Sequence, residues 1–486
     1  MRRFASVVAA IAIASAAPCR AQGGSLACSA CHVSSSGGAL TQTGREYRWR
    51  ANGADDELAG YHAGISTRFS SVSGASGASG GSGGESDAAP SGFGHWSGET
   101  SVFSRIGRTR SHGQVVPLIS LIETLHLHGE GTVGDDTVTF DGDGFARQGL
   151  YSYDGGVDPD AVGFSMAQVT WKSAASGALA RLGRQYVVAG AATRRVDGLD
   201  VRTPFGDSSE VEIFGGVPSD NGFGGSNGDF IGGGRVATRL GDSFGIGASG
   251  FYAKDASDPA DAKGGVDANW TPVRKLDLYG HVYYDWIADR IYDGRLDAIW
   301  QPTLSWQVEA SYTHSVPALF LPKDSLFWVF SVDAYDESAL TLTRRFGERL
   351  SANLYGRHTA YGDGDRLEQF GGGVDQRYGP NGEDTVGGEV AWQDEERGSL
   401  GGSSIDGDVV YLRGYHQLWW TGAIYTALDA SIQHMLSSSV RDATLLRAVV
   451  GYDPHGRWDV ECGVDWRRDP DFACGVDLFA RLRIRF

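Results

Sequence analysis

The chain lacks the features that mark several common protein classes. Beyond the first 21 residues, no stretch approaches the roughly 18 consecutive apolar residues that a membrane-spanning helix needs. Lysine and arginine number 42 against 60 aspartates and glutamates, and the net charge of −18 argues against a nucleic-acid partner. No Ser/His/Asp set or paired-carboxylate motif is specific enough to indicate a hydrolase. These absences exclude a helical membrane protein and a nucleic-acid-binding protein, and they leave any enzymatic activity uncertain.

The first 21 residues have the pattern of a secretory signal peptide. Arg2 and Arg3 precede an alanine-rich apolar stretch at residues 4–17, and Ala21 ends a small-residue cleavage site. The chain that remains is expected to be either soluble in the periplasm or a membrane barrel. Its 71 glycines, 13 tryptophans and 19 tyrosines, together with only 3 methionines and 5 cysteines, favour the barrel.

In the last 15 residues, every second side chain is apolar. Phe472 and every second residue to Phe486 are apolar, whereas the positions between them include Asp477, Arg481 and Arg483. A period of two predicts a strand with one apolar face and one polar face. The terminal Phe486, preceded on the same face by Ile484, resembles the C-terminal signal of bacterial outer-membrane barrels.

The same alternation recurs along residues 94–486. It is clear at residues 275–286, 304–313 and 349–357, and turn sequences such as GPNGE and DPHG separate the segments. Alternating segments of about ten residues predict an all-β fold, a transmembrane antiparallel β-barrel in the bacterial outer membrane. Roughly 22 candidate strands give an expected even number between about 16 and 22. The segment 315–345 is compatible with one strand or two, and Trp419 and Trp420 are expected in an interfacial girdle.

A separate segment precedes the predicted barrel. Residues 22–70 carry the sequence CSACH, and residues 71–93 form a Gly/Ser-rich flexible linker. A C-x-x-C-H motif predicts one covalent haem c, with thioether bonds to Cys28 and Cys31 and with His32 as the proximal iron ligand. The alternatives are a disulfide, which does not account for His32, and half of a zinc site, which lacks a second pair of ligands nearby.

The distal iron ligand is open between three histidines. No methionine lies between the signal peptide and residue 165, and His62 is the histidine nearest to the motif. His126 and His128 share one face of a predicted strand with Thr124 and Glu130, which places both rings in the lumen. There they are candidates for a haem or metal ligand, and the alternative is ordinary polar lining.

The remaining two cysteines flank a turn near the end of the chain. Cys462 and Cys474 lie on either side of the sequence RDPD and both fall on apolar positions. We expect them to face each other across a hairpin as a structural disulfide, with two free thiols as the alternative.

The arrangement of a secreted C-x-x-C-H segment before a barrel resembles the fused monohaem cytochrome–porins, among them the outer-membrane c-type cytochromes of iron-oxidising bacteria. Residues 28–38 carry this resemblance, and Ser35 and Ala39 depart from the proline and glycine usual in related porin-like proteins. The resemblance implies that the haem segment lies in or at the barrel mouth. It also implies that electrons pass between an extracellular donor or acceptor, such as Fe(II), and a periplasmic c-type cytochrome.

Two functions follow from these expectations. The first is electron transfer across the outer membrane, since an apolar band about 25 Å tall insulates against electrons and a haem in the lumen would lie within it. The protein would then be an electron carrier with outer-membrane lipid around it and redox partners on both sides. The alternative is a general or cation-preferring diffusion porin in which the haem is structural or sensory.

Overall fold

The structure is a computed structural model of the whole chain. It describes residues 92–111, 114–151, 161–219, 230–254, 261–319, 334–362, 364–379, 382–396, 408–436, 442–468 and 475–486. Among these residues, no helix is long and apolar enough to cross a membrane. The predicted signal peptide, haem segment and linker lie outside the described residues, apart from the last two positions of the linker.

The described residues form 22 strands in a single sheet, joined in chain order as antiparallel neighbours. The strands are β1 (Gly92–Ser111), β2 (Gln114–Val133), β3 (Asp136–Tyr151), β4 (Ala161–Lys172), β5 (Leu179–Ala189), β6 (Ala192–Phe205), β7 (Ser209–Pro218), β8 (Phe230–Leu240), β9 (Phe244–Lys254), β10 (Asp261–Val273), β11 (Leu276–Asp285), β12 (Arg290–Thr303), β13 (Trp306–Ser315), β14 (Tyr335–Phe346), β15 (Leu350–Tyr361), β16 (Arg366–Tyr378), β17 (Asp384–Glu396), β18 (Val409–Trp419), β19 (Ile424–Met435), β20 (Ala443–Tyr452), β21 (Trp458–Arg468) and β22 (Gly475–Arg485).

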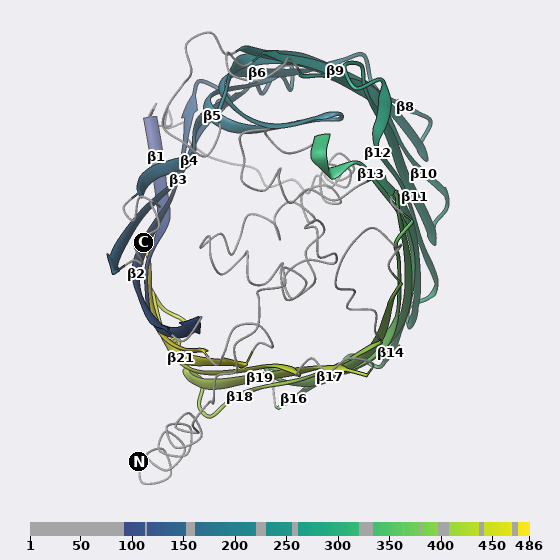
Figure 1. Cartoon of the computed structure of the whole chain (residues 1–486). Coiled ribbons are helices and arrows are strands. Elements are labelled where there is room, and N and C mark those ends of the chain that lie inside the picture. The colour runs from purple at the N-terminus through teal and green to yellow at the C-terminus, as the bar shows by residue number, and fades with distance from the viewer. Residues whose placement is uncertain are drawn as a thin grey trace.

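The sheet closes on itself between its first and last strands. β1 pairs with β2 on one side and with β22 on the other, with Glu99 opposite Arg485 and Thr109 opposite Gly475. Figure 1 shows the resulting ring of strands seen nearly along the barrel axis. Closure leaves no open sheet edge at this seam, and every strand there finds hydrogen-bonding partners on both sides.

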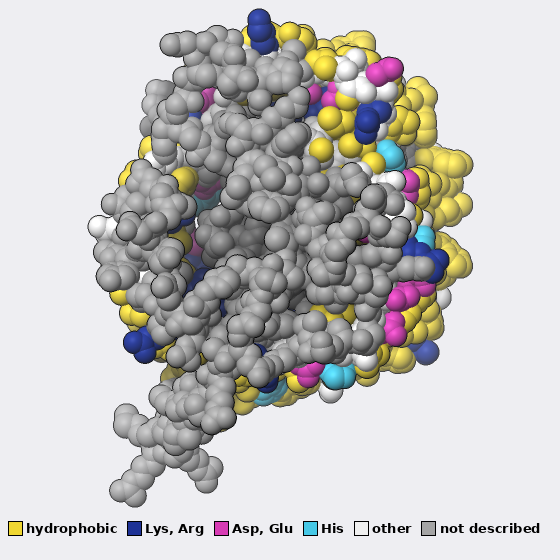
Figure 2. Space-filling view, viewed as in Figure 1, with side chains coloured by type: hydrophobic (Ala, Val, Ile, Leu, Met, Phe, Trp, Pro, Cys, Tyr) yellow, Lys and Arg dark blue, Asp and Glu magenta, His cyan; other side chains and the backbone are white. Residues whose placement is uncertain are grey.

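The outer face of the wall is apolar and exposed. On β22, Leu478, Leu482 and Ile484 lie outside, whereas Asp477 is buried on the inner side, as the alternation in the sequence predicts. The same order holds on β15, where Leu354 is exposed between inward-facing neighbours. Figure 2 shows hydrophobic side chains gathered along the outer edge of the wall. Large apolar groups exposed on the whole circumference are stable only against lipid.

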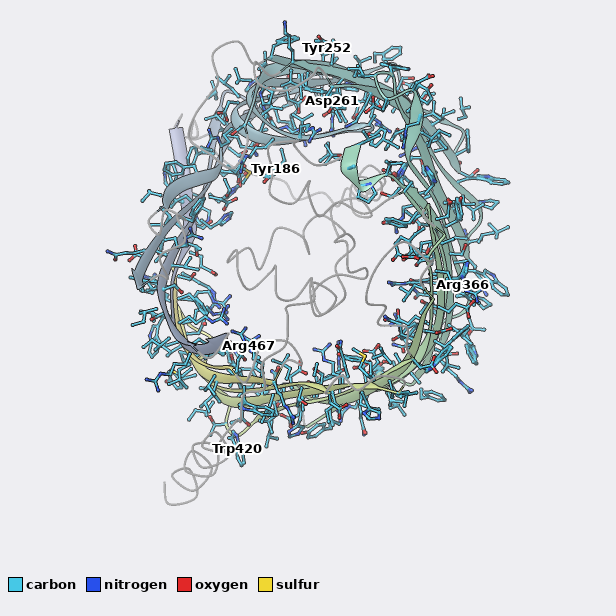
Figure 3. The ribbon with its side chains drawn as sticks, in the orientation of Figure 1. Tyr186, Tyr252, Asp261, Arg366, Trp420 and Arg467 are labelled. Atoms are coloured by element: carbon cyan, nitrogen blue, oxygen red, sulfur yellow. The ribbon has the colours of Figure 1, made fainter. Side chains whose placement is uncertain are left out.

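Aromatic side chains concentrate on the outer face near one rim. Trp420 lies outside the ring of strands, whereas Arg467 points into it (Figure 3). The exposed aromatic residues close to the same strand ends are Trp96, Trp171, Phe205, Trp270, Trp300, Phe346, Trp458 and Phe486. Aromatic rings prefer the boundary between lipid chains and water, so this band marks one membrane interface. It confirms the girdle predicted for Trp420, whereas Trp419 packs against Tyr425 and His455 and is not among the exposed residues of the band.

The two rims differ in the length of their connections. At the aromatic rim just described, strands are joined by turns of two to six residues, such as 134–135 and 304–305. The opposite rim carries the longer connections, among them residues 316–334 and 397–408. Short turns face the periplasm and long loops face the outside in barrels of this kind. The N-terminal end of β1 and the C-terminal end of β22 therefore both lie at the periplasmic rim.

These features define an integral β-barrel of the bacterial outer membrane. The 22 described strands lie at the upper end of the expected range. The ambiguous segment 315–345 resolves into the single strand β14, because β13 pairs directly with β14. Ser315 ends β13, Pro317–Leu319 forms the short 3-10 helix η2, and residues 320–333 lie outside the described residues.

Candidate functional site: the lumen of the barrel

The inner face of the wall is lined by charged side chains in pairs. Each pair except Arg194–Asp261, which joins β6 to β10, joins neighbouring or next-but-one strands on the face opposite the lipid-exposed residues. The pairs are Arg105–Asp477, Arg181–Asp200, Arg202–Glu212, Arg194–Asp261, Arg235–Asp267, Arg413–Asp429, Arg447–Asp465, Arg481–Glu461 and Arg483–Asp459. Opposite charges at alternate inward positions give a polar wall in which most charges are compensated locally.

One of these groups lies at the seam that closes the barrel. Asp477 on β22 is 1% exposed and accepts a hydrogen bond from Arg105 on β1. Arg467 on β21 approaches the same carboxylate with its Nη2 atom 3.4 Å away. Gly107 stands opposite Asp477, and a side chain there would collide with the carboxylate. Three strands therefore meet on one carboxylate at the point where the first and last strands join.

The hairpin formed by β5 and β6 leaves the wall on its way to the outer rim. Pairing between β4 and β5 ends at Ala167 opposite Arg184, and pairing between β6 and β7 ends at Val196 opposite Pro218. Residues 186–194 therefore pair, within the strands, only with the other arm of this hairpin, and Figure 1 shows the hairpin inside the ring of strands. At its base, Gln185 pairs with Val196, and the amide of Ser219 donates to the carbonyl of Arg195 at 2.9 Å. We call residues 185–195 the inward hairpin.

Polar contacts fix the tip of the inward hairpin to strands β9, β10 and β12 of the wall. The amide of Ala191 donates to Ser249 Oγ on β9 at 2.8 Å, and Tyr292 Oη on β12 donates to the carbonyl of Ala191 at 3.1 Å. Arg194 forms an ion pair with Asp261 on β10, with 2.8 Å between Nη2 and Oδ2. The tip is thus held by side chains of three strands.

An apolar cluster lies beneath the inward hairpin. Phe214, Ile231 and Phe251 point inward from β7, β8 and β9 and are almost fully buried. The residues that cover them are Val187, Ala189, Ala192 and Val196, each 0% exposed. Large apolar side chains on an aqueous inner wall would be unfavourable, and burial of each contributes about 1.5–3 kcal/mol. The cluster explains why the hairpin folds inward rather than continuing the wall.

The two histidines predicted to face the lumen do so. His126 and His128 lie on β2, and their neighbours on β3 are Asp143 and Asp141. His126 Nδ1 hydrogen-bonds to Asp143, and His128 Nδ1 lies 2.7 Å from Asp141 Oδ1. The described residues contain no group of three or more His, Cys, Asp and Glu side chains arranged to hold a metal ion.

The haem-attachment residues and one candidate ligand are not part of the described structure. Cys28, Cys31, His32 and His62 lie outside the described residues, so their predicted roles stay predictions.

The predicted contact between the two C-terminal cysteines is wrong for Cys462. The register of β21 and β22 places Cys462 opposite Ala480, and its thiol is free on the exposed outer face. Cys474 lies outside the described residues. The two strands pair from Arg467 opposite Gly475 to Trp458 opposite Ile484. Cys462 therefore lies within the paired region and away from the turn, although the two cysteines are spaced almost symmetrically around that turn in the sequence.

Comparisons with known proteins give matches in fold only. No family model and no curated protein matches the chain. Among solved structures, the P pilus usher (PapC) translocation pore has 11% sequence identity and a TM-score of 0.48, covering 80% of this chain and 99% of that one. OccK5 (OpdH) of Pseudomonas aeruginosa has 11% identity and a TM-score of 0.41, covering 80% and 98%. A BenF-like porin from Pseudomonas fluorescens has 10% identity and a TM-score of 0.42, covering 81% and 100%. With identities this low and TM-scores below 0.5, the matches carry no inference about what passes through this barrel.

Proposed function

We propose that the protein is a diffusion pore for small polar solutes, with a preference for cations. The observation that carries this proposal is the ion-paired inner wall enclosed by an apolar outer wall. A wall of compensated charges offers hydrogen bonds to water and to hydrated solutes throughout the thickness of the membrane. The net charge of −18 favours the approach of cations.

The inward hairpin determines how wide this path is. A barrel of 22 strands is wide compared with the 16 to 18 strands that suffice for an aqueous channel. Residues 185–195 occupy part of that cross-section, held by Arg194 and by the apolar cluster around Phe214. The hairpin thereby excludes large solutes and narrows the route available to small ones.

Uptake into proteoliposomes tests the pore function. We expect vesicles that contain the purified full chain to take up small sugars, amino acids and monovalent cations, with rates that fall steeply as solute size increases. At equal size and low ionic strength, a cationic solute should enter faster than an anionic one, since screening weakens the preference at high salt. Uptake equal to that of empty vesicles for all solutes would refute the proposal.

A second candidate function is electron transfer through a haem c bound to the front segment. Two features favour it: the C-x-x-C-H motif at residues 28–32, and the presence of two carboxylate-bound histidines on the inner wall. When bound, the haem would supply one-electron chemistry, Cys28 and Cys31 would hold it covalently, and His32 would ligate its iron. The partners would be a periplasmic c-type cytochrome and an extracellular metal ion or other redox partner.

Haem staining of outer membranes tests this second function. We expect a covalent haem signal at the mass of the protein and a reduced-minus-oxidised absorption difference in the wild type. Replacement Cys31→Ala should strongly reduce the covalent signal, because one of the two thioether bonds cannot form. Cys462→Ala serves as the matched control and should leave the signal unchanged. Absence of haem from the wild type would remove the second function and leave the pore function untouched.

A further inference from the structure

We propose that the barrel wall has a lateral opening between β4 and β5, through which uncharged amphipathic molecules pass between the lumen and the outer leaflet of the membrane. The proposal goes beyond the pore function, since it concerns passage through the wall rather than along the barrel axis. It starts from the place where the inward hairpin leaves the wall.

The gap in the wall begins at Ala167 on β4. Ala167 opposite Arg184 is the last pair between β4 and β5, yet β4 continues through residues 161–166 and pairs there with β3. Among the described residues, no strand pairs with the other edge of residues 161–166. Two local features accompany the separation. The register between β3 and β4 shifts at Ser165, and Gly183 has a φ of 121°, in the region that favours glycine.

The gap lies at a level where lipid surrounds the barrel. Trp171, a member of the aromatic band at the periplasmic rim, follows Ala167 on β4 at a height difference of about 10 Å for a tilted strand. The apolar band of an outer membrane is about 25 Å tall. Phe164, farther out on the same strand, is 54% exposed on the outer face. Lipid therefore reaches the gap from outside.

One face of β5 and β6 runs from the lipid to the lumen. Leu182 and Leu199 lie opposite each other on this face and are exposed on the outside of the barrel. Farther along the same face, Tyr186 stands opposite Arg195 on the inward hairpin, whose other face covers the apolar cluster. Figure 3 shows Tyr186 inside the ring of strands. The face therefore crosses the line of the wall between these two pairs.

An ion pair stands at this crossing. Arg184 donates to both carboxylate oxygens of Asp197, from Nε and from Nη2, each at 2.7 Å. Its Nη1 donates to the carbonyl of Phe164 at 3.0 Å. Phe164 belongs to the part of β4 that has no strand partner on this side, and an unsatisfied backbone carbonyl is unfavourable in lipid. The side chain of Arg184 thereby replaces the missing strand and holds the gap closed.

A cavity of about 440 Å³ lies beside this ion pair. Phe164 and Ala167 line it from β4, residues 182–184 from β5 and residues 197–198 from β6. The lining is mainly apolar, and its two charged side chains neutralise each other. A cavity of this size accommodates a small molecule. An ion would lose its hydration there without gaining a counter-charge, so the lining fits an uncharged molecule with a large apolar part and one hydrogen-bonding group.

Entry of an uncharged fluorescent probe into outer-membrane vesicles tests the opening. The probe is N-phenyl-1-naphthylamine, which fluoresces in lipid and crosses a lipopolysaccharide leaflet slowly. We expect vesicles that carry the full chain, made from cells without their own major porins, to take it up faster than vesicles without the chain. Arg184→Ala should raise the rate about tenfold, because the closed gap loses at least one charge-assisted hydrogen bond. Ala167→Trp fills the cavity and should return the rate to that of vesicles without the chain.

The matched controls are Arg413→Ala and Ala310→Trp. Arg413 forms the same two-bond pair with Asp429, but between strands that stay paired along the wall. Ala310 is exposed on the outer face of β13, which pairs with both of its neighbours. Both variants should take up the probe at the wild-type rate. Equal rates in Ala167→Trp and Ala310→Trp would overturn the proposal, as would a rate without gain in both the wild type and Arg184→Ala.

Two further readouts separate this opening from the pore along the barrel axis. Uptake of a small sugar by the same vesicles should be unchanged in Ala167→Trp, since the cavity lies outside the lumen path. Failure of the lateral opening and failure of the pore function are therefore separately visible. The anionic analogue 8-anilinonaphthalene-1-sulfonate should gain little from Arg184→Ala at high salt, and a gain equal to that of the uncharged probe would contradict the assigned chemistry.

Discussion

Removal of the inward hairpin will raise the single-channel conductance about twofold or more. The variant lacks residues 186–195 and joins Gln185 to Val196 through an Asn-Gly turn, which suits two residues that already stand opposite each other. The expected rise follows from the contacts of the hairpin. Residues 186–194 pair with no strand of the wall other than the two arms of the hairpin itself, and the hairpin lies inside the ring. Its loss therefore widens the path without removing a strand. Planar-bilayer recording of single channels gives the conductance.

A milder variant distinguishes an effect on the width of the conducting path from general damage to the barrel. Arg194→Glu replaces the attraction to Asp261 by repulsion and should increase the conductance or its fluctuation, since the tip loses one of its attachments. Thr193→Glu introduces a glutamate at an exposed neighbouring position, changes the charge by one unit instead of two, and is the control. If the deletion and Arg194→Glu both conduct like the wild type while running as folded barrels on gels, the hairpin does not limit the path.

Replacement Asp477→Ala will destabilise the barrel by about 1–3 kcal/mol, because it removes the buried carboxylate on which two partly exposed guanidinium groups converge. Arg105 and Arg467 both approach this carboxylate, and Asp477 is only 1% exposed. The loss occurs where β1 and β22 meet, so it also weakens the closure of the barrel. Equilibrium unfolding by urea in detergent micelles or lipid vesicles measures the free-energy change.

Two controls accompany the seam variant. Asp477→Asn keeps the shape and some hydrogen bonding and should cost less than Asp477→Ala. Asp135→Ala removes a carboxylate from an exposed periplasmic turn and should change the free energy of unfolding by no more than about 0.5 kcal/mol. Equal effects of Asp477→Ala and Asp135→Ala would show that the seam carboxylate contributes nothing particular.

The architecture of the barrel could be predicted from the sequence because its wall obeys one local rule. Lipid on one side and water on the other impose a period of two, and the alternation at residues 472–486 and 304–313 shows it without reference to any distant strand. The same parity placed His126 and His128 in the lumen correctly. The register between strands could not be predicted in the same way. Cys462 lies opposite Ala480 because hydrogen bonds along both full strands set the register, and the spacing of residues around the turn does not determine it.

The inward hairpin was not predicted, because its sequence alternates only partly and resembles any other hairpin of the wall. Signals do exist. Residues 187–189 are apolar without interruption, and Phe214, Ile231 and Phe251 occupy inward positions where polar residues are expected. Each of these features alone is a local irregularity in the alternation. Together they indicate an inward hairpin only once it is known that β5 and β6 lie over β7, β8 and β9, and the sequence does not show this contact.

The central claim is that the barrel is an open path for small hydrated ions across the outer membrane. Its most direct test is the current through the purified full chain in a planar lipid bilayer with a salt gradient. The account predicts discrete conductance steps and a reversal potential on the cation-selective side, with selectivity that weakens as salt increases. A bilayer that contains folded protein and shows no steps, or steps selective for anions at low salt, would contradict it.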